Sequence, residues 1–286
     1  MAGNLSTRIG IAAVLIPAAV GALWLGGWPL AGAIAALGVL GTREVFDLAR
    51  RQGIDALAAP GYAAAAAIPL ATYAAHRLGW PGGTTAWYAG VLWLLALPVV
   101  AMAQRGPKGR PLTAVAVTVF GALYASAPLA FLIVIRHGLN SERQPLAYLV
   151  LAVFPLALTW ICDTAAFSAG SQFGGPKMAP VLSPRKTWSG AAGGLAGALV
   201  FAVALGLLVL NRFGWQFGVW QLLGIGLVVG VVGQVGDLAE SLLKREAGVK
   251  DSSDLIPGHG GVLDRLDSLY FVIPATAALL ALYGVI

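Results

Sequence analysis

Residues 236–271 read GDLAESLLKREAGVKDSSDLIPGHGGVLDRLDSLYF and form a strongly polar stretch in a chain that is mostly apolar. Long apolar runs flank it, at 222–235 and at 269–283. We therefore expect Asp237, Glu240, Asp264 and Asp267 at or inside the ends of membrane-spanning helices, where ionisable groups are costly and generally mark a functional site. Of the 12 acidic residues in the chain, seven lie here: Asp237, Glu240, Glu246, Asp251, Asp254, Asp264 and Asp267.

The spacing within this stretch predicts a binding site. Asp237 and Glu240 are three residues apart, as are Asp264 and Asp267, so we expect each pair to share one helix face. Carboxylates beside cations and glycines, whose backbone N–H groups can approach a ligand closely, suit a Mg²⁺ ion that carries phosphates. Carboxylates alone would suit a cation pathway. The cations between and beside the acidic pairs are Lys244, Arg245, Lys250 and Arg265.

The composition places the protein in a membrane. Of its 286 residues, 58% are hydrophobic and 10% are charged, whereas soluble domains are about 25% charged. We therefore expect an all-α polytopic membrane protein. The net charge of +6 does not indicate nucleic-acid binding, because the basic residues fall in short loops, where they set topology and meet anionic headgroups. The single cysteine, Cys162, excludes an intrachain disulfide and a cysteine-rich metal site.

Apolar runs of roughly 17–25 residues predict about nine transmembrane helices around a polar cavity that faces the cytoplasm. We expect one integral-membrane domain over 1–286, with N-terminal helices over about 1–140 and catalytic helices and loops over about 145–286. The predicted spans are about 9–27, 29–48, 60–78, 86–104, 112–135, 145–170, 188–210, 217–243 and 262–284.

The basic residues predict the topology. With the N-terminus inside, only Arg77, Arg136, Arg143 and Arg212 of the 18 basic residues fall on the outer side. This positive-inside bias predicts that the polar blocks 163–188 and 237–267 lie on the cytoplasmic side of the membrane. Small residues four apart, as in the pairs Gly190/Gly194, Gly193/Gly197 and Gly226/Gly230, predict close helix packing within one chain, and a homodimer seam is the alternative.

The polar residues of 241–267 follow the pattern S-x-x-K-R-x-x-x-x-K-D-x-S-x-x-x-P-G-H-G-G-x-x-D-R-x-D. This pattern resembles the hallmark of phosphatidate cytidylyltransferases, also called CDP-diacylglycerol synthases. The segment 163–188, with its SPRKTW run at 183–188, is similar to that family's other polar block. The family usually carries Glu where this chain has Ser189, so the resemblance gives no carboxylate role to this position.

The resemblance implies transfer of CMP from CTP to phosphatidic acid, giving CDP-diacylglycerol and pyrophosphate, by an integral protein of the bacterial cytoplasmic membrane with its active site on the cytoplasmic side. It implies Mg²⁺ as cofactor, with a second cation such as K⁺ also fitting the cluster, and CTP, phosphatidic acid and membrane lipids as partners. Asp237 and Asp264 occupy the metal-binding positions, with Asp267 and Asp163 as further ligands or as groups that orient them. The other catalytic candidates are Lys244, Arg245, Lys250, Asp251, His259 and Arg265.

Residues alone also predict a phosphate clamp, because the run 183–188 ends at a predicted helix start, where free N–H groups and the helix dipole favour an anion. His259, between glycines, is expected to be exposed and to bind phosphate or shape the turn. The basic residues could instead be loop charges at the membrane interface, and Asp237 and Asp264 could be partners of nearby cations. The substrate-binding candidates are Ser183, Arg185, Lys186, Thr187, Gly260 and Gly261.

Other functions fit parts of the pattern. A related enzyme acting on polyprenyl or archaeal ether lipids, as a cytidylyltransferase or a kinase, would need the same metal and phosphate groups. A cation-coupled transporter would explain the intramembrane carboxylates and the Gly/Pro-interrupted helices, but not the basic PGHGG loop. The sequence also leaves open whether Glu44, at the end of the second span, pairs with Arg43 or reaches the site.

Overall fold

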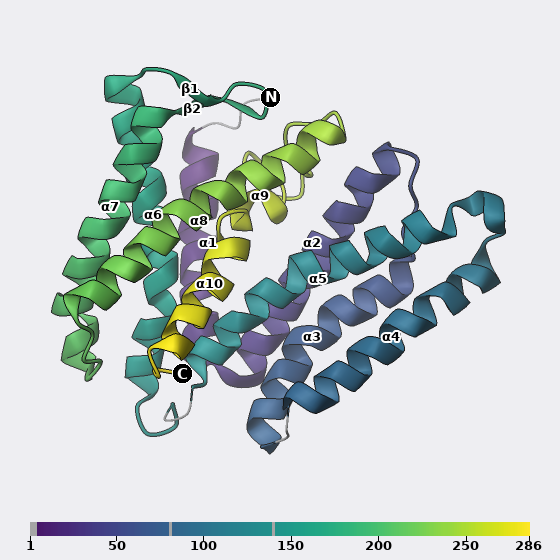
Figure 1. Cartoon of the computed structure of the whole chain (residues 1–286), viewed down its shortest axis with the longest axis horizontal. Coiled ribbons are helices and arrows are strands. Elements are labelled where there is room, and N and C mark those ends of the chain that lie inside the picture. Colours follow the sequence, from purple (N-terminus) through teal and green to yellow (C-terminus); the bar gives the residue numbers. More distant parts are fainter. Residues whose placement is uncertain (1–4, 80–81, 139–140) are drawn as a thin grey trace. The chain divides into compact units, whose positions relative to one another are not determined.

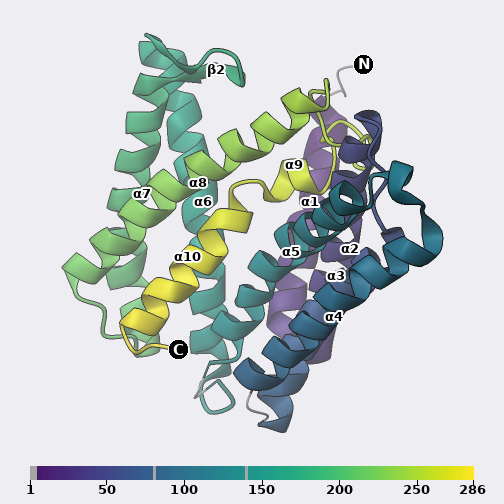
Figure 2. The same ribbon diagram turned by 45° about the vertical axis from the view of Figure 1, so that its right-hand side comes forward.

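The computed structural model describes residues 5–79, 82–138 and 141–286, which are almost entirely helical (Figures 1 and 2). This confirms the predicted fold class. The chain divides into two compact units. The first comprises Met1–Ile133 and Glu246–Arg265, and the second comprises Val134–Arg245 and Leu266–Ile286.

Five long helices make up most of the first unit, and α5 ends three residues beyond its boundary. The long loop 247–262 and the one-turn helix α9 complete it. The elements are α1 (Leu5–Leu25), α2 (Gly27–Arg51), α3 (Ala58–Leu78), α4 (Gly82–Gln104), the 3₁₀ turn Pro107–Gly109, α5 (Pro111–Arg136) and α9 (Leu263–Leu266).

Phe46 of α2 fixes this helix against α3 and α5. The ring is 1% exposed. A Cβ added at Gly61 of α3 would lie 2.5 Å from Cζ of Phe46, and one at Gly121 of α5 would lie 2.7 Å from Cε1. Thr42 of α2 donates to the Gly121 carbonyl at 3.2 Å. The absence of side chains at the two glycines thus lets three helices close on one aromatic ring and holds the end of α2 in place.

The second unit contains four long helices and one short hairpin. Figure 1 shows the hairpin where α6 leads into α7. The elements are α6 (Pro145–Phe173), β1 (Lys177–Ala179), β2 (Ser183–Thr187), α7 (Trp188–Leu208), the 3₁₀ turn Leu210–Phe213, α8 (Val219–Glu246) and α10 (Leu269–Leu282). The strands pair antiparallel, Lys177 opposite Thr187 and Ala179 opposite Ser183. The hairpin was not predicted, because its five-residue second strand lacks the alternating pattern of a half-buried strand.

The glycines of the predicted small-residue pairs pack against neighbouring helices of the same chain. A Cβ at Gly197 of α7 would lie 2.6 Å from Cβ of Ala165 on α6. One at Gly226 of α8 would lie 2.9 Å from the Ala198 carbonyl oxygen of α7. These glycines therefore allow the close approach of α6, α7 and α8, as the sequence predicts.

Seven helices in the described residues are long and apolar enough to cross a membrane, which makes the chain an integral membrane protein. The seven do not include α3, and only Ile16–Leu25 of α1 is counted, as a shorter apolar helix. The nine-span count therefore stays a prediction. The seven are Gly27–Arg51, Gly83–Gln104, Pro107–Arg136, Pro145–Phe173, Trp188–Phe213, Val219–Glu246 and Leu263–Leu282.

The last predicted span, 262–284, is not one regular helix. It consists of α9 and α10, separated by a turn at Asp267 and Ser268. The Asp267 carboxylate accepts a hydrogen bond from the N–H of Ser268 at 2.6 Å, and such local side-chain bonds compete with the helical pattern. Asp264 lies in α9 and Asp267 in the turn that follows it, so the common helix face of this pair stays a prediction.

Candidate active site

An ion pair joins the hairpin to α8 in the second unit. The ammonium nitrogen of Lys186, on β2, lies 2.6 Å from Oδ2 of Asp237, on α8. The two side chains are 25% and 32% exposed, so both are accessible to a ligand. Ser241, one turn further along α8, donates to Oδ1 of Asp237 at 3.4 Å. A predicted phosphate-binding cation and a predicted metal ligand thus lie together at one place.

The hairpin is held in this position from two sides. Arg245 of α8 donates from Nε to the Leu182 carbonyl at the hairpin turn, at 3.2 Å. Thr187 caps α7, because its hydroxyl accepts from the N–H of Gly190 at 3.1 Å. Helix α7 therefore begins at Trp188, directly after the SPRKT run, as predicted. Arg245 has a structural contact here in addition to any role with substrate.

Ser189 stands where the family that the motif resembles usually has Glu. Its hydroxyl group makes two contacts. Its hydroxyl donates to the Gly174 carbonyl and lies 3.0 Å from the Thr187 hydroxyl. These bonds connect the end of α6 to the start of α7. The side chain thus stabilises the base of the hairpin and carries no charge.

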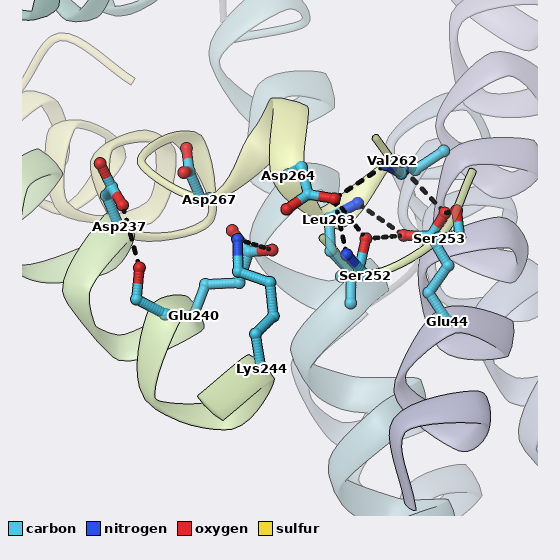
Figure 3. A network of polar contacts seen from close by, with 12 residues as sticks. Glu44, Asp237, Glu240, Lys244, Ser252, Ser253, Val262, Leu263, Asp264 and Asp267 are labelled. Carbon is cyan, nitrogen blue, oxygen red and sulfur yellow. Dashed lines mark hydrogen bonds and ion pairs between the residues drawn. The ribbon is translucent and has the colours of Figure 1, made fainter. Parts of the chain in front are cut away.

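Further carboxylates surround Asp237 in the second unit. The charges of Asp163, on α6, and Asp267, in the turn after α9, each interact with that of Asp237. Lys186 is close enough to act on Asp163, and Lys244 acts on Asp267. Figure 3 shows Asp237 and Asp267 among the labelled side chains. The three carboxylates repel one another, and the two lysines offset part of this negative charge. Such an electrostatic environment favours an added cation.

These residues fit Mg²⁺ by their chemistry. Carboxylate oxygens are its usual protein ligands, and it is commonly held by one or two carboxylates together with waters and substrate phosphates. Such a site needs no cage of protein ligands. Within residues 5–79, 82–138 and 141–286, no group of three or more His, Cys, Asp or Glu side chains stands at metal-binding distance.

Lys244 makes a buried ion pair on the same helix. Its ammonium lies 3.2 Å from Oε1 of Glu240, one turn earlier on α8, and the side chains are 9% and 0% exposed (Figure 3). This pairing is the expected arrangement for an acid and a base four residues apart. The pair is shielded from solvent. The charge of Lys244 also interacts with that of Asp267.

In the first unit, Asp264 organises the loop of the sequence motif. It is 8% exposed. Its Oδ2 accepts three hydrogen bonds at 2.8 Å, from the N–H and the hydroxyl of Ser252 and from the N–H of Gly261. A Cβ at Gly260, where φ is +77°, would lie 2.6 Å from the same oxygen. The glycines therefore pack against this carboxylate, whatever contact they also make with a phosphate.

The PGHGG segment forms the predicted turn. The N–H of Ile256 donates to the Gly260 carbonyl at 2.8 Å, and the N–H of His259 donates to the Ile256 carbonyl at 2.9 Å. Gly258 and Gly260 have φ of 72° and 77°, which favour glycine. His259 is half-buried rather than exposed, and its Nδ1 is buried without a hydrogen-bond partner among the described residues. The backbone of His259 thus shapes the turn.

The remaining candidate residues are partly or fully exposed. Ser183 is half-buried at the start of β2, whereas Arg185, two residues later, is exposed. Lys250, Asp251 and Arg265 are exposed in or beside the motif loop. Their roles with substrate stay predictions.

Glu44, which the sequence left open, is a member of the motif-loop network. It does not pair with Arg43, whose guanidinium lies 3.9 Å from Asp47. Its carboxylate accepts hydrogen bonds from Ser252, Ser253, Val262 and Leu263. The sequence signal that could have identified Glu44 is its position on the face of α2 that also carries the buried core residues. A carboxylate there needs partners, because an unpartnered buried charge is costly.

Comparison with known proteins identifies a family and several relatives of this chain. Residues 6–283 match the model of the cytidylyltransferase family. A phosphatidate cytidylyltransferase of Brucella suis biovar 1 (strain 1330) is 49% identical over 134 residues, which are 47% of this chain and 46% of that protein. The phosphatidate cytidylyltransferase of Staphylococcus aureus (strain COL) is 43% identical over 128 residues, 45% of this chain and 48% of that protein.

The aligned part of this chain spans about half the length of these relatives. The family match, in contrast, runs through both units and includes both polar blocks. The resemblance seen in the motif residues is thereby confirmed. The chain belongs to the cytidylyltransferase family.

Proposed function

We propose that the protein transfers CMP from CTP to phosphatidic acid, giving CDP-diacylglycerol and pyrophosphate. The observation that carries the proposal is the 2.6 Å ion pair between Lys186, a residue of the predicted phosphate clamp, and Asp237, a predicted metal ligand, in a chain of this family. The names of the relatives support the substrate pair.

The reaction exchanges one phosphorus–oxygen bond for another. A phosphate oxygen of phosphatidic acid attacks the α-phosphorus of CTP, the bond from that phosphorus to its bridging oxygen breaks, and pyrophosphate leaves with the bonding electrons. A phosphate monoester is already anionic near neutral pH, so the attacking oxygen needs no strong base. Positioning and charge neutralisation are therefore the main tasks of the protein.

Mg²⁺ would be held by Asp237 and Asp264, with Asp267 and Asp163 as further ligands or orienting groups, and a second cation such as K⁺ suits the same acidic residues. When bound, Mg²⁺ supplies positive charge to the phosphate oxygens. Lys186 is the residue best placed to hold a phosphate near Asp237, because its ammonium is partly exposed and already lies at the carboxylate. Arg185, exposed on the same strand, offers a second cation to the same substrate.

We further propose that the reaction takes place at the cytoplasmic face, where CTP is available. The support is the distribution of basic residues, which favours the cytoplasm for both polar blocks. A bacterial inner membrane fits the bacterial sources of the relatives.

The direct test uses purified protein with labelled CTP, phosphatidic acid and Mg²⁺, and measures labelled lipid and released pyrophosphate. We expect both products in equal amounts. Labelled lipid formed from polyprenyl phosphate or an archaeal ether lipid, but not from phosphatidic acid, would contradict the proposed acceptor. Transfer of the γ-phosphate would indicate a kinase, and cation flux in liposomes without CTP would indicate a transporter.

A further inference from the structure

Glu44 lies far from the motif in sequence but at the centre of its loop. It is 3% exposed, near the end of α2. Its Oε1 accepts from the Ser253 hydroxyl at 2.7 Å and from the Val262 N–H at 2.9 Å. Its Oε2 accepts from the Ser252 hydroxyl at 2.8 Å and from the Leu263 N–H at 2.9 Å. Both ends of the loop 252–263 are thus fastened to one carboxylate (Figure 3).

Ser252 links Glu44 to Asp264. Its hydroxyl oxygen lies 2.8 Å from Oε2 of Glu44 and 2.8 Å from Oδ2 of Asp264, so the two carboxylates share its single proton. Its N–H donates to the same Asp264 oxygen. A displacement of Glu44 would therefore release Ser252, which makes two of the three hydrogen bonds that fix Oδ2 of Asp264.

Gly261 shows that this arrangement leaves no free space. A Cβ at this position would overlap the Ser252 hydroxyl, and it would lie 2.5 Å from Oε1 of Glu44. The N–H of Gly261 donates to Asp264, and those of Val262 and Leu263 donate to Glu44. Three successive amides after the PGHG turn thus bind protein carboxylates. The sequence had suggested that such amides would bind the substrate phosphate.

The carboxylate of Glu44 is itself well fixed. Phe46, two residues later on α2, is clasped by Gly61 and Gly121. Ser253, Val262 and Leu263 donate to the carboxylate, and it shares the single hydroxyl proton of Ser252 with Asp264. A group that is anchored by packing and held by hydrogen bonds can transmit a rigid position to the residues that bind it.

We propose that Glu44 is the positioning residue of the motif loop: it sets the conformation of 252–263 and, through Ser252, the orientation of the Asp264 carboxylate. The inference rests on the proposed function, because it concerns a carboxylate that the reaction uses. Glu44 itself does not touch the substrate. Its effect is therefore on turnover and on the dependence of activity on Mg²⁺, and less on the KM for CTP.

The test compares Glu44→Gln with Asp47→Asn in the full-length protein. Both replace an acid by its amide on α2, but Asp47 binds Arg43 and Arg50 and makes no bond to the loop in the described residues. The amide of Gln cannot accept the hydrogen bonds that one oxygen of Glu44 accepts, and its NH₂ group would face two donors. Ser253→Ala, which removes a single donor, is a milder variant that serves if Glu44→Gln does not fold.

Hydrogen–deuterium exchange without metal or substrate is the first measurement. We expect faster exchange at Val262 and Leu263 in Glu44→Gln and, to a smaller extent, in Ser253→Ala. Exchange within α2 should match that of Asp47→Asn. Unchanged exchange in the loop would overturn the inference whether or not the protein transfers CMP.

Kinetics provide the second measurement. We expect kcat of Glu44→Gln to fall by about 10- to 100-fold, as is typical when a group that orients a metal ligand is lost, with a higher Mg²⁺ requirement and a KM for CTP near that of the parent. Wild-type kinetics beside a loosened loop would also overturn the positioning role. A parent protein that makes no labelled lipid would instead contradict the proposed function, and the exchange result would still decide the effect of Glu44 on the loop.

Discussion

The ammonium of Lys186 lies 2.6 Å from the carboxylate of Asp237, so a cation of the hairpin is paired with an acid of α8. Each charge lies beside one of opposite sign. A Mg²⁺ ion with its phosphates would offer each of them a new partner of the right sign, since the carboxylate prefers the metal and the ammonium prefers the phosphate. The ion pair thus holds both groups ready for the proposed reaction.

Replacing Asp237 with Asn should remove activity without unfolding the protein. The amide keeps the shape of the side chain but loses the charge that a metal ligand supplies. We expect transfer to fall by about 100-fold or more. Because the pair with Lys186 is partly exposed, the free energy of unfolding should change by less than about 1 kcal/mol. Activity against Mg²⁺ concentration, run beside thermal unfolding in detergent, measures both. Loss of activity that follows loss of fold would contradict the metal role.

Lys186→Ala should impair turnover with a normal yield of folded, membrane-inserted protein. We expect the main contribution of the lysine to be its charge at the hairpin. We expect kcat/KM for CTP to fall by about 100-fold. Arg185→Ala should show a loss in the same direction. Lys177→Ala, on the paired strand of the hairpin, is a matched control for loss of a surface lysine. If both clamp variants keep the parent kinetics, these residues serve topology alone.

Asp264→Asn should behave differently from Asp237→Asn. Asp264 is buried, and a single oxygen accepts three hydrogen bonds from the motif loop. An NH₂ group at that oxygen would leave donors unsatisfied, and the free energy of unfolding should fall by about 1–3 kcal/mol. Thermal unfolding of the two, measured in parallel, decides between equal and unequal stability.

Two structural features of the candidate site could be predicted from the sequence because their signals are local. Helix α7 begins at Trp188, where the SPRKT run ends, and the PGHGG segment forms a turn with two glycines at positive φ. Spacing along the chain encodes both features. Glu44 could not be placed in this way, since its partners are 208–219 residues away and no periodicity links them. Hydropathy likewise detects apolar runs, so it treated 262–284 as one span and missed the turn at Asp267.

One predicted crossing that is not among the seven helices, α3, can be tested directly. The nine-span prediction places its two ends on opposite sides of the membrane. Cysteines introduced at Gln52 and at Leu78, both exposed, test this with a membrane-impermeant thiol reagent. Cys162, the single native cysteine, is buried and gives little background. We expect the first site to react from the cytoplasm and the second from outside. Labelling of both from one side would contradict nine spans.

Gly261→Ala should damage the motif loop through Glu44. A methyl group at this position would overlap the Ser252 hydroxyl and press on the Glu44 carboxylate. Both neighbours are fixed by hydrogen bonds, so neither can move without breaking them. We expect the free energy of unfolding to fall by about 1–3 kcal/mol, as for other overpacked sites.

Gly90→Ala on α4 is the matched control, because nothing lies within 4 Å of a Cβ there and alanine is the better helix former. It should unfold at or above the parent temperature and keep full activity. For Gly261→Ala we expect a lower unfolding temperature together with reduced cytidylyl transfer. If Gly261 were kept only for close approach of a phosphate, the variant would lose activity at unchanged stability, because the alanine methyl would then meet substrate rather than Glu44.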